Sequence, residues 1–152
     1  MRTGEIIKSI SSTPTEEELL LINKYTRRPF EAEEVYTFSV VLCDNDVDRD
    51  YERFTVEALF QLEKLFVGKT GISDHTPKAE NQCARIYMCN VEAAEGRKTA
   101  TGDDYFRLVA KAYMPRCEGN ENIITQIESG IRKEVSIGCA SRKAVCSVCS
   151  SD

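Results

Sequence analysis

The chain has 152 residues, 41% of them hydrophobic and 30% charged, a composition typical of one soluble globular domain large enough to bury a core. Its net charge of −5 offers nucleic acid no general attraction, and Lys and Arg are scattered among acidic residues rather than gathered in a basic stripe. No apolar run approaches the roughly 18 residues of a membrane helix, and the N-terminus lacks a signal-peptide core, so neither nucleic acid nor a membrane is expected as a partner.

The first two predicted elements are a helix and a strand. Residues 13–16 read TPTE, a capping box with Pro14 at the first helical position, which predicts a helix that continues through Ile22. Residues 34–42, EVYTFSVVL, are dense in β-branched and aromatic residues and predict a strand.

The middle of the chain predicts a second helix and two more strands. Thr55 can cap a helix over residues 56–66, where the apolar positions form one broad face. Residues 84–91 favour a strand, residues 96–102 a polar loop, and residues 105–114 alternate between apolar and polar in the manner of a half-buried strand.

The C-terminal part predicts a third helix from Asn120 and a last strand over residues 134–140. Adjacent strands interrupted by helices indicate an α+β domain with a mainly antiparallel sheet or barrel and about three surrounding helices. We expect residues 1–152 to form a single domain, with a helical lead-in over residues 1–33 and a core over residues 34–145.

Seven cysteines, an odd number, favour buried reduced thiols over a disulfide framework. The exception is Cys146-Ser-Val-Cys149, a CxxC motif that supplies half of a zinc site. Cys139 could add a third ligand. The alternatives are surface thiols or a half-site whose partners follow residue 152, so Cys146 and Cys149 are weak metal candidates and no cofactor is expected.

One histidine, His75, limits every mechanism that needs an imidazole base. Ser136, in the stretch KEVSIGC, is the hydroxyl that such a base could activate by taking its proton. Each residue also has a structural interpretation. Ser73, Asp74, Thr76 and Pro77 are turn formers around the histidine, and small hydroxyl residues are common in strands.

Two other kinds of site compete with this pair. Cys139 could act as the nucleophile, but it lies three residues after Ser136 and so on the opposite strand face, and only one of the two can face the histidine. The alternating acids of residues 44–50 resemble the start of a calcium-binding EF-hand loop. That match fails, because Arg49 replaces the required glycine and Thr55 stands where the bidentate glutamate belongs.

Three segments in this order resemble the prohead (capsid maturation) proteases of tailed phages and prophages, serine peptidases related to the herpesvirus assembly protease. Residues 35–59 match the early strand, Asp-rich turn and helix of that family. Residues 68–86, GKTGISDHTPKAENQCARI, match the segment with the catalytic histidine, and residues 130–139, GIRKEVSIGC, match the segment with the serine. The resemblance covers roughly residues 35–140.

The resemblance implies a herpesvirus-protease-like fold, with Ser136 as nucleophile and His75 as general base. It implies that the enzyme cleaves phage scaffold protein, the major capsid protein precursor and itself, needs no cofactor, and works as a homo-oligomer. Its implied location is the bacterial host cytoplasm, inside assembling proheads.

The third catalytic residue is where the chain departs from the family pattern, because the herpesvirus relatives use a second histidine that this chain lacks. Glu134 is the candidate on geometry, since it lies two residues before Ser136 on the same strand face, roughly 7 Å away. Asp74 is a weaker candidate, and a residue beyond 152 is a third option. A serine–lysine dyad with Lys133 is disfavoured, because an odd offset places Lys133 on the other strand face. We expect a serine endopeptidase whose chain is truncated at its C-terminus relative to the family. A truncation that removes part of the site could leave the chain folded yet inactive.

An alternative function belongs to another class. The same fold could serve as a non-catalytic capsid-assembly or scaffold-type binding module, with zinc bound through Cys146 and Cys149.

Overall fold

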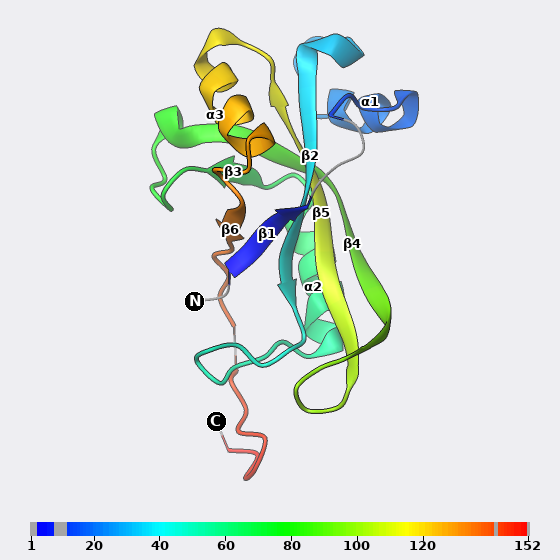
Figure 1. Ribbon diagram of the computed structural model, residues 1–152, viewed down its shortest axis with the longest axis vertical. Coiled ribbons are helices and arrows are strands. Elements are labelled where there is room, and N and C mark those ends of the chain that lie inside the picture. Colours follow the sequence, from blue (N-terminus) through cyan, green and yellow to red (C-terminus); the bar gives the residue numbers. More distant parts are fainter. Residues whose placement is uncertain (1–2, 8–11, 142, 152) are drawn as a thin grey trace.

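The computed structural model describes residues 3–7, 12–141 and 143–151, which form an α+β fold (Figure 1). The strands are β1 Thr3–Ile7, β2 Val35–Asp44, β3 Thr70–Ile72, β4 Gln82–Lys98, β5 Asp104–Pro115 and β6 Glu134–Ser136. The α-helices are α1 Glu16–Asn23, α2 Val56–Phe66 and α3 Glu118–Glu128, with short 3₁₀ helices at Ala32–Glu34 and Ala79–Asn81. The predicted fold class is confirmed: every strand pair is antiparallel, and the sheet curls into a half-barrel.

The strand order is β3-β4-β5-β2-β1-β6, so the long strands β4, β5 and β2 form the centre of the sheet. The two shortest strands, β3 and β6, lie at its two ends (Figure 1). β6 carries Ser136 and His75 follows β3 along the chain, so the two predicted catalytic residues belong to the two ends of the sheet.

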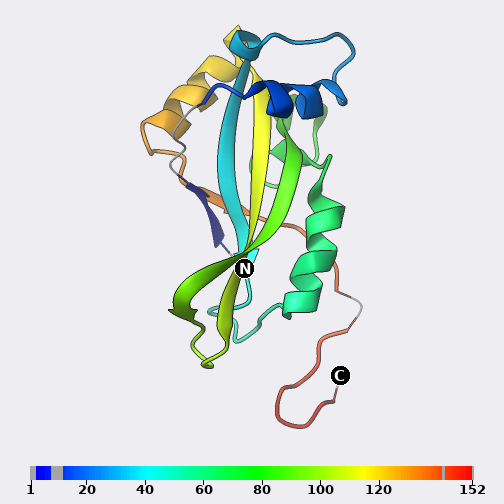
Figure 2. The same ribbon diagram turned by 90° about the vertical axis from the view of Figure 1, so that its right-hand side faces the viewer.

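Each α-helix buries part of one face against the sheet. Leu59 and Leu62 of α2 join the largest core cluster, Ile22 of α1 packs with residues of β2, β4 and β5, and Ile124 of α3 packs against β2 and β5. Figure 2 shows α2 running alongside the long strands, with α1 and α3 near one end of the sheet. Burying one such side chain contributes about 1.5–3 kcal/mol, so these contacts fix where the helices lie.

The second helix is confirmed with its predicted cap. The Thr55 hydroxyl accepts a hydrogen bond from the Ala58 N–H at 3.1 Å, which satisfies one of the free donors at the helix start. Gly68 follows the helix with φ +84, a left-handed conformation that glycine adopts without strain.

The predicted cap of the first helix is wrong by two residues. The capping box is formed by Thr15 and Glu18, so Pro14 precedes the helix instead of opening it. The Glu18 N–H donates to Thr15 Oγ1 at 3.2 Å and the Thr15 N–H donates to Glu18 Oε2 at 3.0 Å. Both threonines have a glutamate three residues later, Glu16 for Thr13 and Glu18 for Thr15, and the helix uses the second pair.

The two longest strands extend beyond their predicted ends. β4 continues to Lys98, so the predicted loop over residues 96–102 shortens to the turn between β4 and β5. The polar extension carries no apolar pattern to reveal it. It forms because β5 pairs with it, with Ala93 opposite Phe106 and Lys98 opposite Asp104.

The predicted helical lead-in over residues 1–33 also contains a strand, β1. β1 pairs with β2 on one side and with β6 on the other, so the sheet core begins at Thr3 and not at residue 34. Within the described residues, no helix combines the length and apolarity that crossing a membrane requires.

Two predicted boundaries near the C-terminus are also wrong. The third helix starts at Glu118 with Cys117 as its N-cap, two residues before Asn120. The last strand spans only Glu134–Ser136 and not residues 134–140, and its ladder with β1 runs from Glu134 opposite Glu5 to Ser136 opposite Thr3.

Candidate functional site

Ser136 is the last residue of β6 and lies opposite Thr3 in the ladder with β1. Its neighbours Val135 and Ile137 both pack against the largest core cluster. Because side chains alternate along a strand, Val135 and Ile137 face the core and the Ser136 side chain lies on the opposite face. A backbone hydrogen bond from Ile6 N–H to the Lys133 carbonyl, 2.8 Å long, extends the pairing by one residue.

The Ser136 hydroxyl is buried and has no hydrogen-bond partner, the one such side-chain oxygen or nitrogen among the described residues. Leaving a buried hydroxyl unbonded costs about 1–3 kcal/mol, so native structures rarely contain one without a reason. A nucleophile held ready for a substrate is one such reason.

His75 lies in the turn between β3 and the 3₁₀ helix at Ala79–Asn81, with its side chain exposed. Asp74 and His75 both have left-handed backbones, with φ +57 and +51. Such conformations cost a non-glycine residue about 1–3 kcal/mol. Hydrogen bonds within the turn hold it in place, including Thr76 N–H to the Ser73 carbonyl at 3.2 Å.

The curl of the sheet brings its two ends toward each other. Arg132, just before β6, lies close enough to Cys83 of β4 for its charge to act on the thiol. Burial raises the pKa of the Cys83 thiol, while a hydrogen bond with Ser73 and the Arg132 charge oppose that rise. Ser73 is two residues from His75, so the segments that carry the two predicted catalytic residues occupy the same side of the half-barrel (Figure 1).

The predicted pair is not joined by a hydrogen bond, because Ser136 Oγ has no partner at all. The side chain of the third predicted residue, Glu134, is 63% exposed, and its carboxylate forms an ion pair with Lys133 Nζ at 3.8 Å. The fold therefore brings the serine and histidine segments together without assembling a hydrogen-bonded triad in the unliganded chain.

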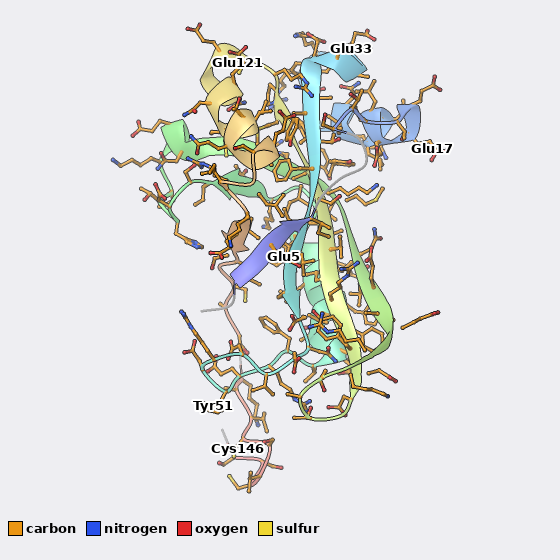
Figure 3. The ribbon with its side chains drawn as sticks, viewed as in Figure 1. Glu5, Glu17, Glu33, Tyr51, Glu121 and Cys146 are labelled. Carbon is orange, nitrogen blue, oxygen red and sulfur yellow. The ribbon has the colours of Figure 1, made fainter. Side chains whose placement is uncertain are left out.

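A hollow of about 210 Å³ lies beside the β1–β6 pair and includes Glu134 in its lining. In Figure 3, Glu5 marks the β1 side of this region. A second, more open hollow of about 360 Å³ is lined by three arginines, Arg27, Arg28 and Arg85. Sequence reasoning did not predict this basic hollow, because its arginines come from segments far apart in the chain.

The cysteines divide into buried and exposed groups. Cys43 and Cys89 are buried, Cys83 is half-buried, and the exposed ones are Cys117, Cys139, Cys146 and Cys149. No group of three or more potential metal-ligating His, Cys, Asp or Glu side chains exists within residues 3–7, 12–141 and 143–151. Cys139 therefore does not complete a zinc site with the CxxC pair in the described chain.

The comparisons with known proteins found no matching family model, curated protein or solved structure. The functional interpretation therefore rests on the residues and on the fold that positions them.

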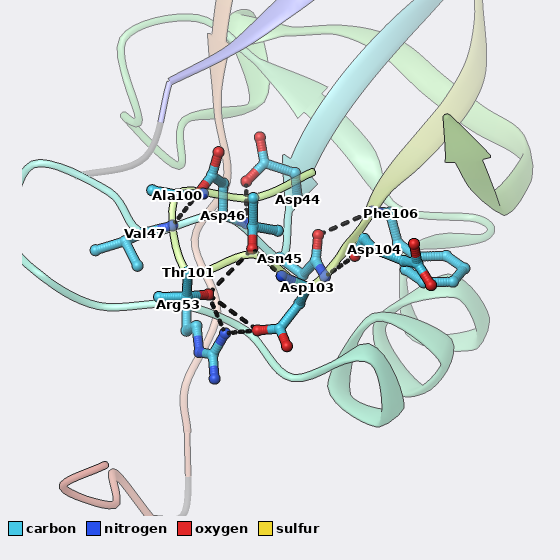
Figure 4. A network of polar contacts seen from close by, with 11 residues as sticks. Asp44, Asn45, Asp46, Val47, Arg53, Ala100, Thr101, Asp103, Asp104 and Phe106 are labelled. Atoms are coloured by element: carbon cyan, nitrogen blue, oxygen red, sulfur yellow. Dashed lines mark hydrogen bonds and ion pairs between the residues drawn. The ribbon is translucent and has the colours of Figure 1, made fainter. Parts of the chain in front are cut away.

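The acidic turn after β2 has a structural role (Figure 4). Asp44 Oδ1 accepts from the Asp46 N–H at 2.9 Å, and Asp46 Oδ1 accepts from the N–H groups of Val47 and Ala100 at 2.9 and 2.8 Å. Asn45, only 4% exposed, donates to the Asp104 carbonyl at 2.8 Å. These carboxylates and the amide tie the turn to the β4–β5 connection, consistent with the failed EF-hand match.

Proposed function

We propose that the chain is a serine endopeptidase of the prohead-protease type, which cleaves phage scaffold protein, the capsid protein precursor and itself during capsid assembly. The observation that carries the proposal is the Ser136 hydroxyl, which is buried without a partner on a strand anchored by core contacts. The herpesvirus-protease-like architecture is part of this proposal and is supported by the curled antiparallel sheet with its helices.

In the proposed mechanism, Ser136 Oγ attacks the scissile carbonyl while His75 takes its proton and later gives it to the leaving amine. The histidine must move toward the serine when a substrate binds, because catalytic hydrogen bonds often tighten only in the substrate complex. Gly138 lies two residues after the serine, and a Cβ at this position would meet no atom within 4 Å. Its exposed backbone is open to a substrate, so an N–H near it can stabilise the oxyanion.

A fluorophosphonate probe tests the nucleophile directly. We expect the probe to label Ser136 covalently, and we expect Ser136→Ala to abolish both labelling and cleavage of a co-expressed capsid or scaffold protein. His75→Gln should reduce both strongly. Ser39→Ala, which removes the hydroxyl of a half-buried serine on β2, is the matched control and should keep both. Full cleavage by the Ser136→Ala variant would rule out the proposal.

The competing function is a non-catalytic capsid-assembly module. Two observations favour this function. Ser136 and His75 share no hydrogen bond, and the exposed Glu134 forms an ion pair with Lys133. This function predicts that the fluorophosphonate leaves Ser136 unlabelled while the Ser136→Ala variant still binds capsid or scaffold protein in pull-down from co-expressing bacteria. The two proposals therefore predict opposite results for fluorophosphonate labelling of Ser136 in the wild-type chain.

A further inference from the structure

The CxxC motif lies in a turn near the C-terminus that hydrogen bonds close from both ends. The Cys146 carbonyl accepts from the Ser150 N–H, and the Cys146 N–H donates to the Ser151 carbonyl, both at 2.9 Å. Residues three apart in such a turn have Cα atoms within about 7 Å, and a disulfide requires a Cα separation of about 4.4–6.8 Å. The turn thus holds the two cysteines at a separation that a disulfide can bridge.

The turn also activates one of the two thiols. Cys149 Sγ lies 2.9 Å from Ser151 Oγ. Hydrogen bonds from the Ser151 side chain, from the Ser151 backbone N–H and from the Cys146 side chain lower the pKa of Cys149 to about 7. Because only the thiolate is a nucleophile, a large share of Cys149 is reactive at neutral pH.

Both thiols are accessible to reagents in solution. Cys146 and Cys149 are exposed, and in Figure 3 Cys146 lies on the C-terminal segment, well away from Glu5 and the body of the sheet. An accessible thiol of low pKa with a second thiol beside it is the arrangement that redox-active cysteines use. A tetrahedral metal site would need two further ligands, whereas a disulfide needs only these two sulfurs.

We propose that Cys146 and Cys149 are a redox-active dithiol that forms an intrachain disulfide by exchange with a low-molecular-weight disulfide such as oxidised glutathione. The Cys149 thiolate attacks one sulfur of the reagent, breaks its S–S bond and releases one thiolate, which takes up a proton. Cys146 then loses its proton and attacks Cys149 Sγ in the mixed disulfide, releasing the second glutathione as a thiol. The two cysteines lose two electrons and two protons, and one molecule of reagent is reduced to two thiols.

The test uses the whole reduced chain, incubated without oxygen in glutathione buffers of defined ratio, quenched with acid and alkylated. Trypsin cuts after Lys143 and releases residues 144–152 with both cysteines in one peptide. We expect this peptide to become lighter by two hydrogen atoms and to resist alkylation. The Cys146→Ser variant should instead stop at a glutathione adduct on Cys149, because the resolving thiol is missing.

The pH dependence provides a second measurement. The alkylation rate of Cys149 should reach half its maximum near pH 7, and Ser151→Ala should move that midpoint upward, because the hydroxyl that stabilises the thiolate is lost. Cys117→Ser, which removes another exposed thiol, is the control and should change neither result. The proposal is overturned if the peptide stays reduced at every glutathione ratio, or if stoichiometric Zn²⁺ binds the pair and protects both thiols.

Discussion

Lys111 Nζ lies 2.6 Å from Glu18 Oε1, an ion pair that joins the first helix to the central strand β5. The Glu18 side chain is 15% exposed, and the same oxygen accepts from the Tyr87 hydroxyl on β4 at 3.2 Å. Glu18 also completes the capping box of α1. One carboxylate therefore caps the helix and docks it onto two strands.

Glu18→Gln should lower the free energy of unfolding by about 1–2 kcal/mol near neutral pH, because charge-assisted hydrogen bonds are lost. Burial alone would raise the pKa of Glu18, but the bonds from Lys111, the Thr15 N–H and Tyr87 outweigh it and the pKa is lowered below 4.5. The stabilisation is thus present above about pH 4.5 and is lost as the pH falls through the folded-state pKa. Urea unfolding at several pH values checks this.

The matched control for this prediction is Glu17→Gln, which changes an exposed glutamate on the same helix. It should leave the unfolding free energy within about 0.5 kcal/mol of wild type at every pH. If the difference between wild type and Glu18→Gln does not shrink in acid, the ion pair is not the source of the stabilisation.

Local sequence predicted the elements whose signals lie within the element itself. Thr55 with the apolar face that follows it was sufficient for α2, and the alternation of residues 105–114 was sufficient for most of β5. β1 was missed because a five-residue strand depends on partners far along the chain, such as Val41 opposite Glu5 and Ser39 opposite Ile7. The polar end of β4 was missed for the same reason.

Ser136→Ala should leave the protein as stable as wild type or slightly more stable, although it removes the proposed nucleophile. The reason is that a buried hydroxyl without a partner contributes a desolvation cost and no hydrogen bond. Thermal unfolding followed by circular dichroism measures this.

Thr99→Val gives the contrast. Thr99 is 5% exposed, and its hydroxyl accepts from the Asp103 N–H at 3.1 Å and lies 3.0 Å from Thr101 Oγ1. Loss of this hydroxyl should lower the free energy of unfolding by about 1–2 kcal/mol. A Ser136→Ala variant destabilised to the same extent would mean that the serine hydroxyl has a bonding role in the fold.

The seven thiols of the reduced protein should react with Ellman's reagent in distinct phases. The four exposed thiols, Cys117, Cys139, Cys146 and Cys149, should react in the first phase. Cys83 should follow more slowly, since burial raises its pKa. Cys43 and Cys89 should react only on unfolding, because both are buried, and burial together with the Glu63 charge raises the pKa of Cys89 to about 12. Stopped-flow absorbance at pH 8, with and without urea, counts each phase, and a fifth fast thiol would contradict the burial.

The candidate site was predictable from sequence only as a set of residue types. A single histidine and a serine between two apolar strand residues could be recognised along the chain. Their spatial relationship depends on the curl of the whole sheet, which places Arg132 near Cys83 and which no local pattern encodes. Ser136 likewise owes its place to the pairing of β6 with β1, where Thr3 lies opposite it from the other end of the chain.

Gly4→Ala should detach the strand that holds the proposed nucleophile. A Cβ at Gly4 would collide with the Val41 carbonyl oxygen and would lie 2.8 Å from Val135 Cγ2, so β1 would have to shift from β2 or from β6. We expect a loss of about 1–3 kcal/mol in unfolding free energy. Because Thr3 pairs with Ser136 in the same ladder, fluorophosphonate labelling of Ser136 should fall as well.

Gly119→Ala is the control for this substitution, since a Cβ there meets nothing within 4 Å and Gly119 lies in the first turn of α3. It should keep wild-type labelling and gain a few tenths of a kcal/mol from the better helix propensity of alanine. If Gly4→Ala lowered stability but left the labelling rate per folded molecule unchanged, the pairing of β1 with β6 would not be what positions the serine. If stability and the labelling rate per folded molecule fell together, the N-terminal strand would be what positions Ser136.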